Sequence, residues 1–427
     1  MNSLLRIPYA AAWAAARGLA AHVSPGESKL RRVFAGRAGL LERFEAWGAH
    51  ARDKTRKLLW VHAPSVGEGL QALPVLQLVR ARRPDVQIAY TFYSPSAEQF
   101  AKTLPADFAD YLPFDTAGDS RRALAALVPA ALVYSKLDLW PVLTEHASRS
   151  GAKLGLVSAT LPLDSRRSGT FGRALLRDAY ALIDAVGAIT TADAERFERL
   201  GIPAERISVT GDTRYDQVWE RARRSLELPT VTALGSDRPT LVAGSTWPSD
   251  ESRLLPAWSS VLKQLPRARL IIAPHELEET QLHDLISRAR ANGWSAARIG
   301  DALADTDVIV VDRMGILGDL YALADCAYVG GGFHGAGLHS VLEPAAFGVP
   351  VLFGPRNSKS ADAAALAAAG GGFEVRDSAS LEQNLLRFLD SGDARDPAGA
   401  RALELVRSGL GASERSFELV SSLLDGR

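Results

Sequence analysis

A glycine-rich stretch from residue 330 to residue 355 holds the residues whose chemistry is easiest to assign. Its sequence, GGGFHGAGLHSVLEPAAFGVPVLFGP, predicts a strand, a loop, a helix beginning near His339 and Ser340, and a second strand. Its glycines leave space beside the free N–H groups of a helix N-terminus, which attract anions. These glycines are Gly330, Gly331, Gly332, Gly335 and Gly337. Glu343 follows one turn later and could accept hydrogen bonds from both hydroxyls of a ribose. The stretch therefore indicates a nucleotide site, and a βαβ turn that binds nothing is the weaker alternative.

Other polar residues stand where apolar runs end. Ligands of parallel α/β sheets bind beyond the carboxyl ends of the strands, so residues at these positions are candidates for binding and catalysis. They are Ser65, Gly67, Glu68, Lys136 and Asp138 in the first half of the chain, and Ser245, Thr246, Pro274, His275 and Glu276 in the second half.

Short apolar runs alternate with helix-like segments along the whole chain. This alternation predicts an α/β protein with doubly wound parallel sheets. The expected strands are 57–63, 86–92, 130–136, 153–159, 185–191 and 207–211 in the first half, and 240–245, 268–274, 308–312, 326–331 and 349–354 in the second.

The length of 427 residues exceeds what one hydrophobic core usually supports, so two domains are expected. The polar segment 220–239 is the expected link between them. We predict an N-terminal segment (1–30), two Rossmann-like domains (31–225 and 226–405) and a terminal helix (406–427). The single cysteine, Cys326, excludes an intramolecular disulfide. Because no group of residues has zinc-like spacing, we expect no metal site and no cofactor.

The N-terminus is basic although the chain carries no net charge. A nucleic-acid-binding protein would more often carry such an excess on its folded body, so no nucleic-acid partner is expected. The segment 1–22 is too interrupted by arginine to span a bilayer. It fits a helix lying on an anionic membrane surface, and a helix packed on the body of the protein is an equal alternative. The apolar face of that helix would contain Leu4, Leu5, Tyr9, Trp13 and Leu19.

Seven stretches stand in order and together cover nearly the whole chain: WVHAPSVGEG (60–69), YTFYSPSAE (90–98), KLDLWP (136–141), VTGDTRYD (209–216), AGSTWPSDE (243–251), APHELEE (273–279) and GLHSVLEPAAFGVPVLFGP (337–355). They resemble the 3-deoxy-D-manno-octulosonic acid (Kdo) transferases. This resemblance implies the GT-B architecture, in which two Rossmann-like domains face a cleft. Some positions depart from the family pattern: Lys136 stands where many members have Glu, and Ser340 where many have Asn.

The resemblance implies an inverting, metal-independent transfer of Kdo from CMP-Kdo to a lipid A precursor (lipid IVA) in lipopolysaccharide synthesis. Such a transfer needs a base for the acceptor hydroxyl, and Glu68 is the expected base. The membrane partner would be the cytoplasmic face of the bacterial inner membrane, contacted through the basic N-terminus. The donor site would contain Ser245, Thr246, Pro274, His275, Glu276, Gly315, Ile316, Leu317, Gly337, Ser340 and Glu343, and the acceptor site Ser65, Gly67, Lys136 and Asp138.

Two alternatives remain at this stage. A UDP-N-acetylglucosamine 2-epimerase-like enzyme would have the same architecture and a similar glycine-rich loop with a glutamate, but it would need neither an acceptor pocket nor a basic N-terminal segment. A non-catalytic nucleotide-sugar-binding protein would have lost the acid at the position of Glu68, which is present here.

Overall fold

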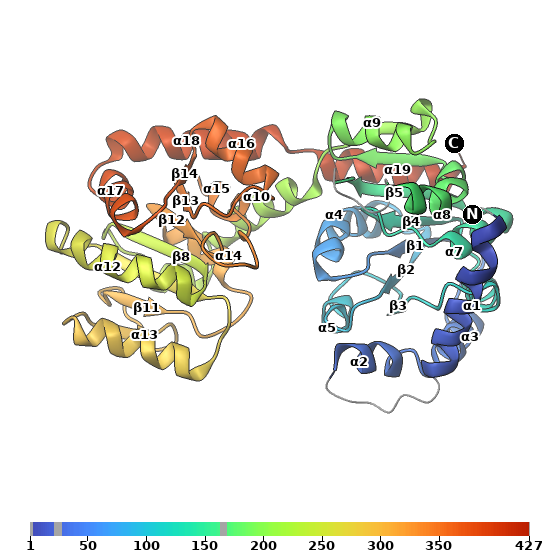
Figure 1. Ribbon diagram of the computed structural model, residues 1–427, viewed down its shortest axis with the longest axis horizontal. Coiled ribbons are helices and arrows are strands. Elements are labelled where there is room, and N and C mark those ends of the chain that lie inside the picture. Colours follow the sequence, from blue (N-terminus) through green and yellow to red (C-terminus); the bar gives the residue numbers. More distant parts are fainter. Residues whose placement is uncertain (1–2, 21–27, 163–168, 427) are drawn as a thin grey trace. The chain divides into compact units, whose positions relative to one another are not determined.

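The computed structural model describes residues 3–20, 28–162 and 169–426, and Figure 1 labels its elements. The chain forms two compact units. Unit 1 contains residues 1–216 and 410–427, and unit 2 contains residues 217–409. The division falls inside helix α10 (Thr213–Ser225), whereas the sequence placed the boundary after residue 225, at the end of this helix.

Unit 1 is built on seven parallel strands in the order β3-β2-β1-β4-β5-β6-β7. Helices α4 (Val66–Arg82) and α19 (Ala412–Asp425) pack together over one face of the sheet, and α3 (Leu40–His50) packs on the other, where Phe44 contacts Trp60. The strands are β1 (Lys57–His62), β2 (Val86–Phe92), β3 (Phe108–Tyr111), β4 (Ala131–Ser135), β5 (Lys153–Ala159), β6 (Ala185–Ala188) and β7 (Ile207–Val209). The other helices are α1 (Ser3–Ala20), α2 (Lys29–Ala35), α5 (Ala97–Ala101), α6 (Ala117–Leu127), α7 (Pro141–Arg149), α8 (Thr170–Ala181), α9 (Thr191–Arg199) and the 3-10 turn η1 (Ala204–Arg206).

Unit 2 also contains seven parallel strands, in the order β10-β11-β9-β8-β12-β13-β14. Alternate residues of each strand point to opposite faces, so Leu241 and Ala243 of β8 belong to one hydrophobic cluster and Val242 belongs to another. The strands are β8 (Thr240–Thr246), β9 (Arg269–Pro274), β10 (Ala296–Arg298), β11 (Val308–Val310), β12 (Cys326–Val329), β13 (Val351–Phe353) and β14 (Gly372–Glu374). The helices are α11 (Pro229–Ala233), α12 (Pro248–Gln264), α13 (Glu279–Ala291), α14 (Leu317–Leu320), η2 (Tyr321–Leu323), α15 (Leu342–Ala345), α16 (Ala361–Ala369), α17 (Ser378–Leu389) and α18 (Gly392–Ser408).

The predicted doubly wound parallel sheets are confirmed, and every expected strand is present. The sequence missed β3, β10 and β14. Each of these lies at an edge of its sheet and is only partly buried. An edge strand is covered on fewer sides, so it lacks the continuous apolar run that marks a central parallel strand.

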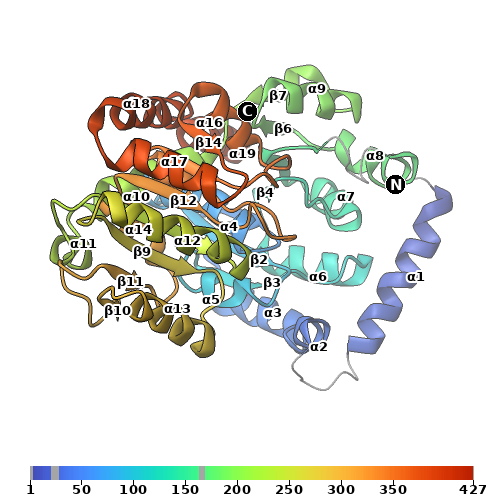
Figure 2. The same ribbon diagram turned by 60° about the vertical axis from the view of Figure 1, so that its left-hand side comes forward.

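Helix α1 lies beside α6 and α7 (Figure 2), with the ring centroid of Trp13 5.3 Å from that of Trp140. Tyr9 also contacts the body through a hydrogen bond to Asp115. Tyr9 and Trp13 thus pack on the body of the protein, which is the second of the two alternatives for the N-terminal helix. Ile7 and Leu19 are 78% and 63% exposed. The side chain of Leu4 lies outside the described residues, and in the described part of the chain no helix is both long and apolar enough to cross a membrane.

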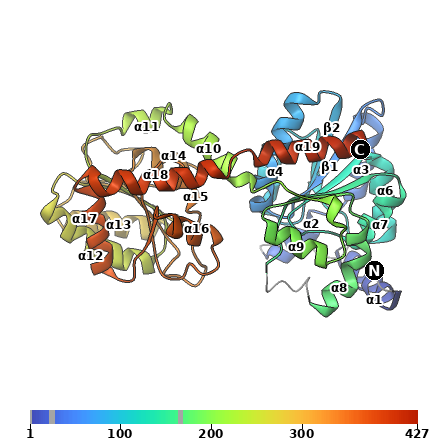
Figure 3. The same cartoon turned by 90° about the horizontal axis from the view of Figure 1, so that it is seen from above.

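The C-terminal helix α19 belongs to unit 1, although the preceding helix α18 belongs to unit 2 (Figure 3). The carboxylate of Asp216 accepts hydrogen bonds from the backbone N–H groups of Gly411 and Ser413, each at 2.7 Å, and so fixes the start of α19. Gly155 in β5 allows the close approach of α19, because a Cβ atom there would lie 2.5 Å from Cδ1 of Leu423.

Three glycines of the stretch 330–355 are required by backbone packing. A Cβ atom on Gly330 would lie 2.2 Å from the carbonyl oxygen of Ser245, and one on Gly332 would lie 2.4 Å from the backbone nitrogen of Gly354. Gly331 has a φ of +91° and would meet the carbonyl oxygen of Gly337. The expectation that these three residues leave room for a ligand is therefore wrong.

The helix expected at His339 and Ser340 is also shorter and later than predicted. Helix α15 spans only Leu342–Ala345, and the chain turns at Gly348, which has a left-handed φ of +71°. Four residues form a single turn, so this segment does not provide the anion-binding helix N-terminus that the sequence suggested.

We predict that Gly332→Ala destabilises unit 2 by about 1–3 kcal/mol, because the added methyl group would overlap backbone atoms that cannot move aside. Gly335→Ala is the matched control, since the nearest neighbour of its Cβ is the end of the Arg356 side chain, 3.9 Å away. Denaturant unfolding of the full chain measures both variants. Equal stability of the two would contradict the packing role of Gly332.

Candidate functional site

The carboxylate of Glu68 is the best-defined reactive group at the carboxyl edge of the unit 1 sheet. Helix α4 follows β1 after a short turn, which places Glu68 in the first turn of the helix and Ser65 at its N-cap. Ser65 Oγ donates a hydrogen bond to Oε2 of Glu68. Lys136 Nζ donates to Oε1 at 3.1 Å. Gly67 is exposed beside them and leaves the surface open at this point.

These contacts keep Glu68 ionised. Burial raises its pKa, but the hydrogen bond from Ser65 and the charge and hydrogen bond of Lys136 outweigh burial, and the pKa lies below its ordinary value. The sequence predicted Ser65, Glu68 and Lys136 as separate site residues, and the structure brings all three together. The pairing of Glu68 with Lys136 has no signal in the sequence, because the residues stand on different strand–helix connections.

The backbone at Lys136 is strained. Lys136 directly follows β4 and has a φ of +60°, a backbone conformation that residues other than glycine rarely adopt. Ser135 secures the same connection, since its Oγ donates to the backbone carbonyl of Glu68 at 3.1 Å. Such strain is often found at functional sites, where the surrounding structure holds it.

Asp138 faces a different neighbour. Its Oδ2 accepts a hydrogen bond from Nε1 of Trp140 at 3.0 Å and lies 3.1 Å from Nε2 of His62. His62 is fully buried, and its Nδ1 donates to the carbonyl of Thr91 at 3.0 Å. Asp138 is therefore part of a polar network beneath the carboxyl edge, next to the connection that carries Lys136.

In unit 2 the end of β8 is distorted. Ser245 has a φ of +53°, and the register between β8 and β9 shifts between Gly244 and Thr246. The hydroxyl of Thr246 is buried and donates to Oε1 of Glu251 at 2.9 Å. The Thr246 hydroxyl thus already has a hydrogen-bond partner within the protein, whereas Ser245 is half-buried at the edge of the sheet.

A stack of one indole and three imidazole rings forms where β8, β9 and β12 end. The ring of Trp247 lies 3.9 Å from that of His334 and 4.6 Å from that of His275, centroid to centroid. His339 lies 4.4 Å from His275, and Nε1 of Trp247 donates to its Nε2 at 3.3 Å. Burial and the neighbouring His275 lower the pKa of His339. The sequence predicted only His275 as a site residue, because the rings come from three separate loops.

The remaining residues of the predicted donor site differ in exposure. Pro274 is the buried last residue of β9, whereas Glu276 and Ser340 are exposed. Gly337 has a φ of +92°, and no atom lies within 4 Å of the position of a Cβ. The same holds for Gly315, so both glycines of the predicted donor site have open space at the position of a Cβ.

Glu343 is half-buried. Burial raises the pKa of its carboxyl group, although the charge of Arg221 opposes this shift. Arg221 itself bonds to Asp319 and to the carbonyl oxygen of Gly315, which places the 315–317 segment close to Glu343. Among the described residues, none donates a hydrogen bond to the Glu343 carboxylate. A half-buried acceptor without a donor is suited to a ligand that supplies hydroxyl groups.

Within the described residues, no group of three or more His, Cys, Asp or Glu side chains is arranged to hold a metal ion.

Comparison with known proteins identifies the family. The family model described as 3-deoxy-D-manno-octulosonic-acid transferase (kdotransferase) matches residues 38–217. A 3-deoxy-D-manno-octulosonic acid transferase of Chlamydophila psittaci is 30% identical over 319 residues, covering 73% of this chain and 72% of the relative. The same enzyme of Haemophilus influenzae is 27% identical over 398 residues, covering 91% of this chain and 92% of the relative.

Solved structures show the fold. A putative UDP-N-acetylglucosamine 2-epimerase of Listeria monocytogenes superposes with a TM-score of 0.59 at 14% identity, covering 87% of this chain and 98% of that protein. The UDP-GlcNAc 2-epimerase of Neisseria meningitidis superposes with a TM-score of 0.55 at 15% identity, covering 83% of this chain and 99% of that protein. At this identity the likeness establishes the GT-B class of two Rossmann-like units and leaves the chemistry open. The relatives decide that point: the chain belongs to the 3-deoxy-D-manno-octulosonic acid (Kdo) transferase family and is a glycosyltransferase.

Proposed function

We propose that this protein transfers Kdo from CMP-Kdo to a lipid A precursor, lipid IVA, in lipopolysaccharide synthesis. The transfer inverts the anomeric centre and uses no metal ion or other cofactor. Membership of the family supports the sugar that is transferred. The observation that carries the chemistry is the ionised carboxylate of Glu68, which Ser65 and Lys136 hold at the carboxyl edge of the unit 1 sheet.

Glu68 acts as the general base. The acceptor hydroxyl oxygen attacks the anomeric carbon of Kdo, the bond from that carbon to the phosphate oxygen of CMP breaks, and the hydroxyl proton passes to Glu68. Attack opposite the leaving group accounts for inversion. A base must be unprotonated before the reaction, and the lowered pKa of Glu68 ensures this at neutral pH.

Unit 2 binds the donor. The half-buried carboxylate of Glu343 accepts hydrogen bonds from the ribose, and the backbone groups of Gly315, Ile316 and Leu317 contact the cytosine. The negative charge of the leaving phosphate needs hydrogen-bond donors around it. We assign donor roles to the side chains of Ser245, His275 and Ser340. Thr246, Pro274, Glu276 and Gly337 border the same part of the site, where the Thr246 hydroxyl is already bonded to Glu251.

Unit 1 binds the acceptor around Glu68. Ser65 and Gly67 border the carboxylate, and Lys136 adds a positive charge suited to a phosphate of the lipid or to the Kdo carboxylate. Asp138 supports this region through His62 and Trp140. A lipid acceptor also requires access to a membrane. We propose peripheral attachment to the cytoplasmic face of the inner membrane through the basic N-terminal segment, with the exposed Ile7 and Leu19 toward the lipid.

Glu68→Gln is expected to lower kcat for Kdo transfer by about 10²–10⁴-fold, because the amide has the size of the acid but accepts no proton. CMP binding should stay as in the native chain, since Glu68 lies in unit 1. Glu195→Gln, an exposed change on α9, is the matched control. Transfer at the native rate by the Gln variant would remove Glu68 from its role. If the folded native chain transfers no Kdo but converts UDP-N-acetylglucosamine, the chain is an epimerase.

Lys136→Met is expected to raise the pKa of Glu68, because the substitution removes a positive charge and a hydrogen bond that lower it. Activity requires ionised Glu68, so the acidic limb of the kcat/KM profile should move to higher pH. Lys136→Arg keeps the charge and should leave the limb near its native position. An acidic limb unchanged in Lys136→Met would show that a different group sets it.

A further inference from the structure

We propose that helix α1 positions the Lys136–Trp140 connection, with Trp13 and Tyr9 as its positioning residues, in addition to any contact that α1 makes with a membrane. The inference rests on the proposed function only for its effect on catalysis. The structural claim is that the Lys136–Trp140 connection keeps its place beside Glu68 only while α1 is docked on unit 1.

The first line of support is aromatic. Trp13 packs against Trp140 and Phe114, with ring centroids 5.3 and 6.1 Å away. Trp140 also stacks against Tyr93, with ring centroids 5.7 Å apart and 21° between the ring planes. The indole of Trp140 donates its N–H to Asp138, so any shift of this ring moves the partner of Asp138.

The second line of support is a buried carboxylate. Asp115 is 2% exposed, and it accepts hydrogen bonds from the backbone N–H groups of Val142 and Leu143 at 3.0 and 2.7 Å. The Tyr9 hydroxyl of α1 donates a further hydrogen bond to it at 2.7 Å. Burial raises the pKa of Asp115 to about 6, although these three hydrogen bonds favour its charged form. Tyr9 thus helps to satisfy the group that holds the first turn of α7, immediately after the Lys136–Trp140 connection.

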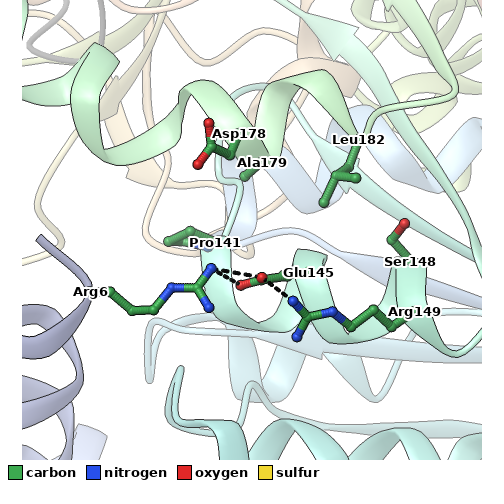
Figure 4. Close-up of a pocket in the computed structure, with 8 residues that line it drawn as sticks. All are labelled: Arg6, Pro141, Glu145, Ser148, Arg149, Asp178, Ala179 and Leu182. Atoms are coloured by element: carbon green, nitrogen blue, oxygen red, sulfur yellow. Dashed lines mark hydrogen bonds and ion pairs between the residues drawn. The ribbon is translucent and has the colours of Figure 1, made fainter. Parts of the chain in front are cut away.

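A third contact lies further along α7. Arg6 of α1 forms an ion pair with Glu145 at 2.7 Å, and Arg149 binds the same carboxylate (Figure 4). The three side chains line a surface pocket of about 220 Å³. An exposed ion pair of this kind contributes little to stability, whereas Tyr9 and Trp13 make their contacts with half-buried side chains. Arg17 of α1 also pairs with the buried carboxylate of Asp119 at 3.0 Å.

The consequence concerns Lys136. Its left-handed backbone is maintained only while its flanking segments are fixed, on one side by β4 and on the other by Trp140 and α7. If α1 loses its contacts, Trp140 loses one of its packing surfaces and Asp115 loses a donor. The connection then gains freedom, and Lys136 and Asp138 are held less accurately near Glu68.

The test combines hydrogen exchange with kinetics on the full chain. Trp13→Ala removes the aromatic contact, Trp13→Phe is the conservative rescue, and Ala11→Ser is an exposed control on the same helix. Transfer is assayed in detergent micelles with a solubilised lipid A precursor, so that attachment to a bilayer does not limit the rate. Hydrogen exchange of peptides covering residues 136–145 reports the positioning itself, and CMP binding reports the integrity of unit 2.

We expect Trp13→Ala to speed exchange in residues 136–145 and to lower kcat/KM for the acceptor by about ten- to a hundred-fold, the scale of a small misplacement of catalytic groups. Trp13→Phe should restore most of the slow exchange and most of kcat/KM, and Ala11→Ser should match the native chain in both measurements. CMP affinity should be unchanged throughout. If residues 136–145 of Trp13→Ala exchange hydrogen at the same rate as in the native chain, the proposal is overturned.

Tyr9→Phe provides a second variant in case Trp13→Ala does not fold. It removes one hydroxyl, so exchange should rise at the amides of Val142 and Leu143, and native exchange there would contradict the docking role of Tyr9. Failure of the proposed function is distinguishable, because a native chain that transfers no Kdo would still show, by exchange alone, whether α1 holds the connection.

Discussion

The site in each unit depends on one constraint, the parallel direction of all strands within a sheet. Parallel strands bring every carboxyl end to the same edge, so connections that are far apart in sequence meet there. In unit 1 this brings Lys136, after β4, within hydrogen-bonding distance of Glu68, after β1. In unit 2 it gathers Trp247, His275 and His334 from three separate loops. The sheets therefore concentrate the polar chemistry at one edge while their faces remain apolar.

The edge is also where the backbone departs from regular geometry. Lys136, Ser158 and Ser245 have positive φ values and lie at or next to the ends of β4, β5 and β8. Each position costs conformational energy, of order 1–3 kcal/mol, which the surrounding packing must offset. The tight contact of Gly330 with Ser245 and the aromatic cluster around Trp140 are suited to that task, since each restrains the chain close to a strained residue.

Glu68 illustrates how two opposing effects on one carboxyl group are resolved. Partial burial favours its neutral form, whereas Ser65 and Lys136 favour the carboxylate, and the second influence prevails. Glu343 shows the opposite balance, because burial prevails and raises its pKa. The two glutamates thus fit different proposed tasks, accepting a proton in one case and accepting hydrogen bonds from a neutral ligand in the other.

The sequence predicted the fold because central parallel strands leave long apolar runs. It also predicted that Glu68 stands where a helix begins after the first strand, since this pattern depends only on neighbouring residues. It could not predict the pairing of Lys136 with Glu68 or the contact of Trp13 with Trp140, because both depend on tertiary packing. It misjudged Gly330 and Gly332, whose absent side chains make room for other backbone segments, and it overestimated the helix near Ser340, which is a single turn at Leu342–Ala345.

The most direct test of the central claim, that unit 2 reads the donor nucleotide and unit 1 supplies the base, is a crystal structure of the full chain with CMP. The account predicts that the ribose hydroxyls donate to Glu343, that the cytosine contacts the backbone of residues 315–317, and that Glu68 does not touch the nucleotide base or ribose. CMP bound within unit 1, or bound in unit 2 without contact to Glu343, would contradict it.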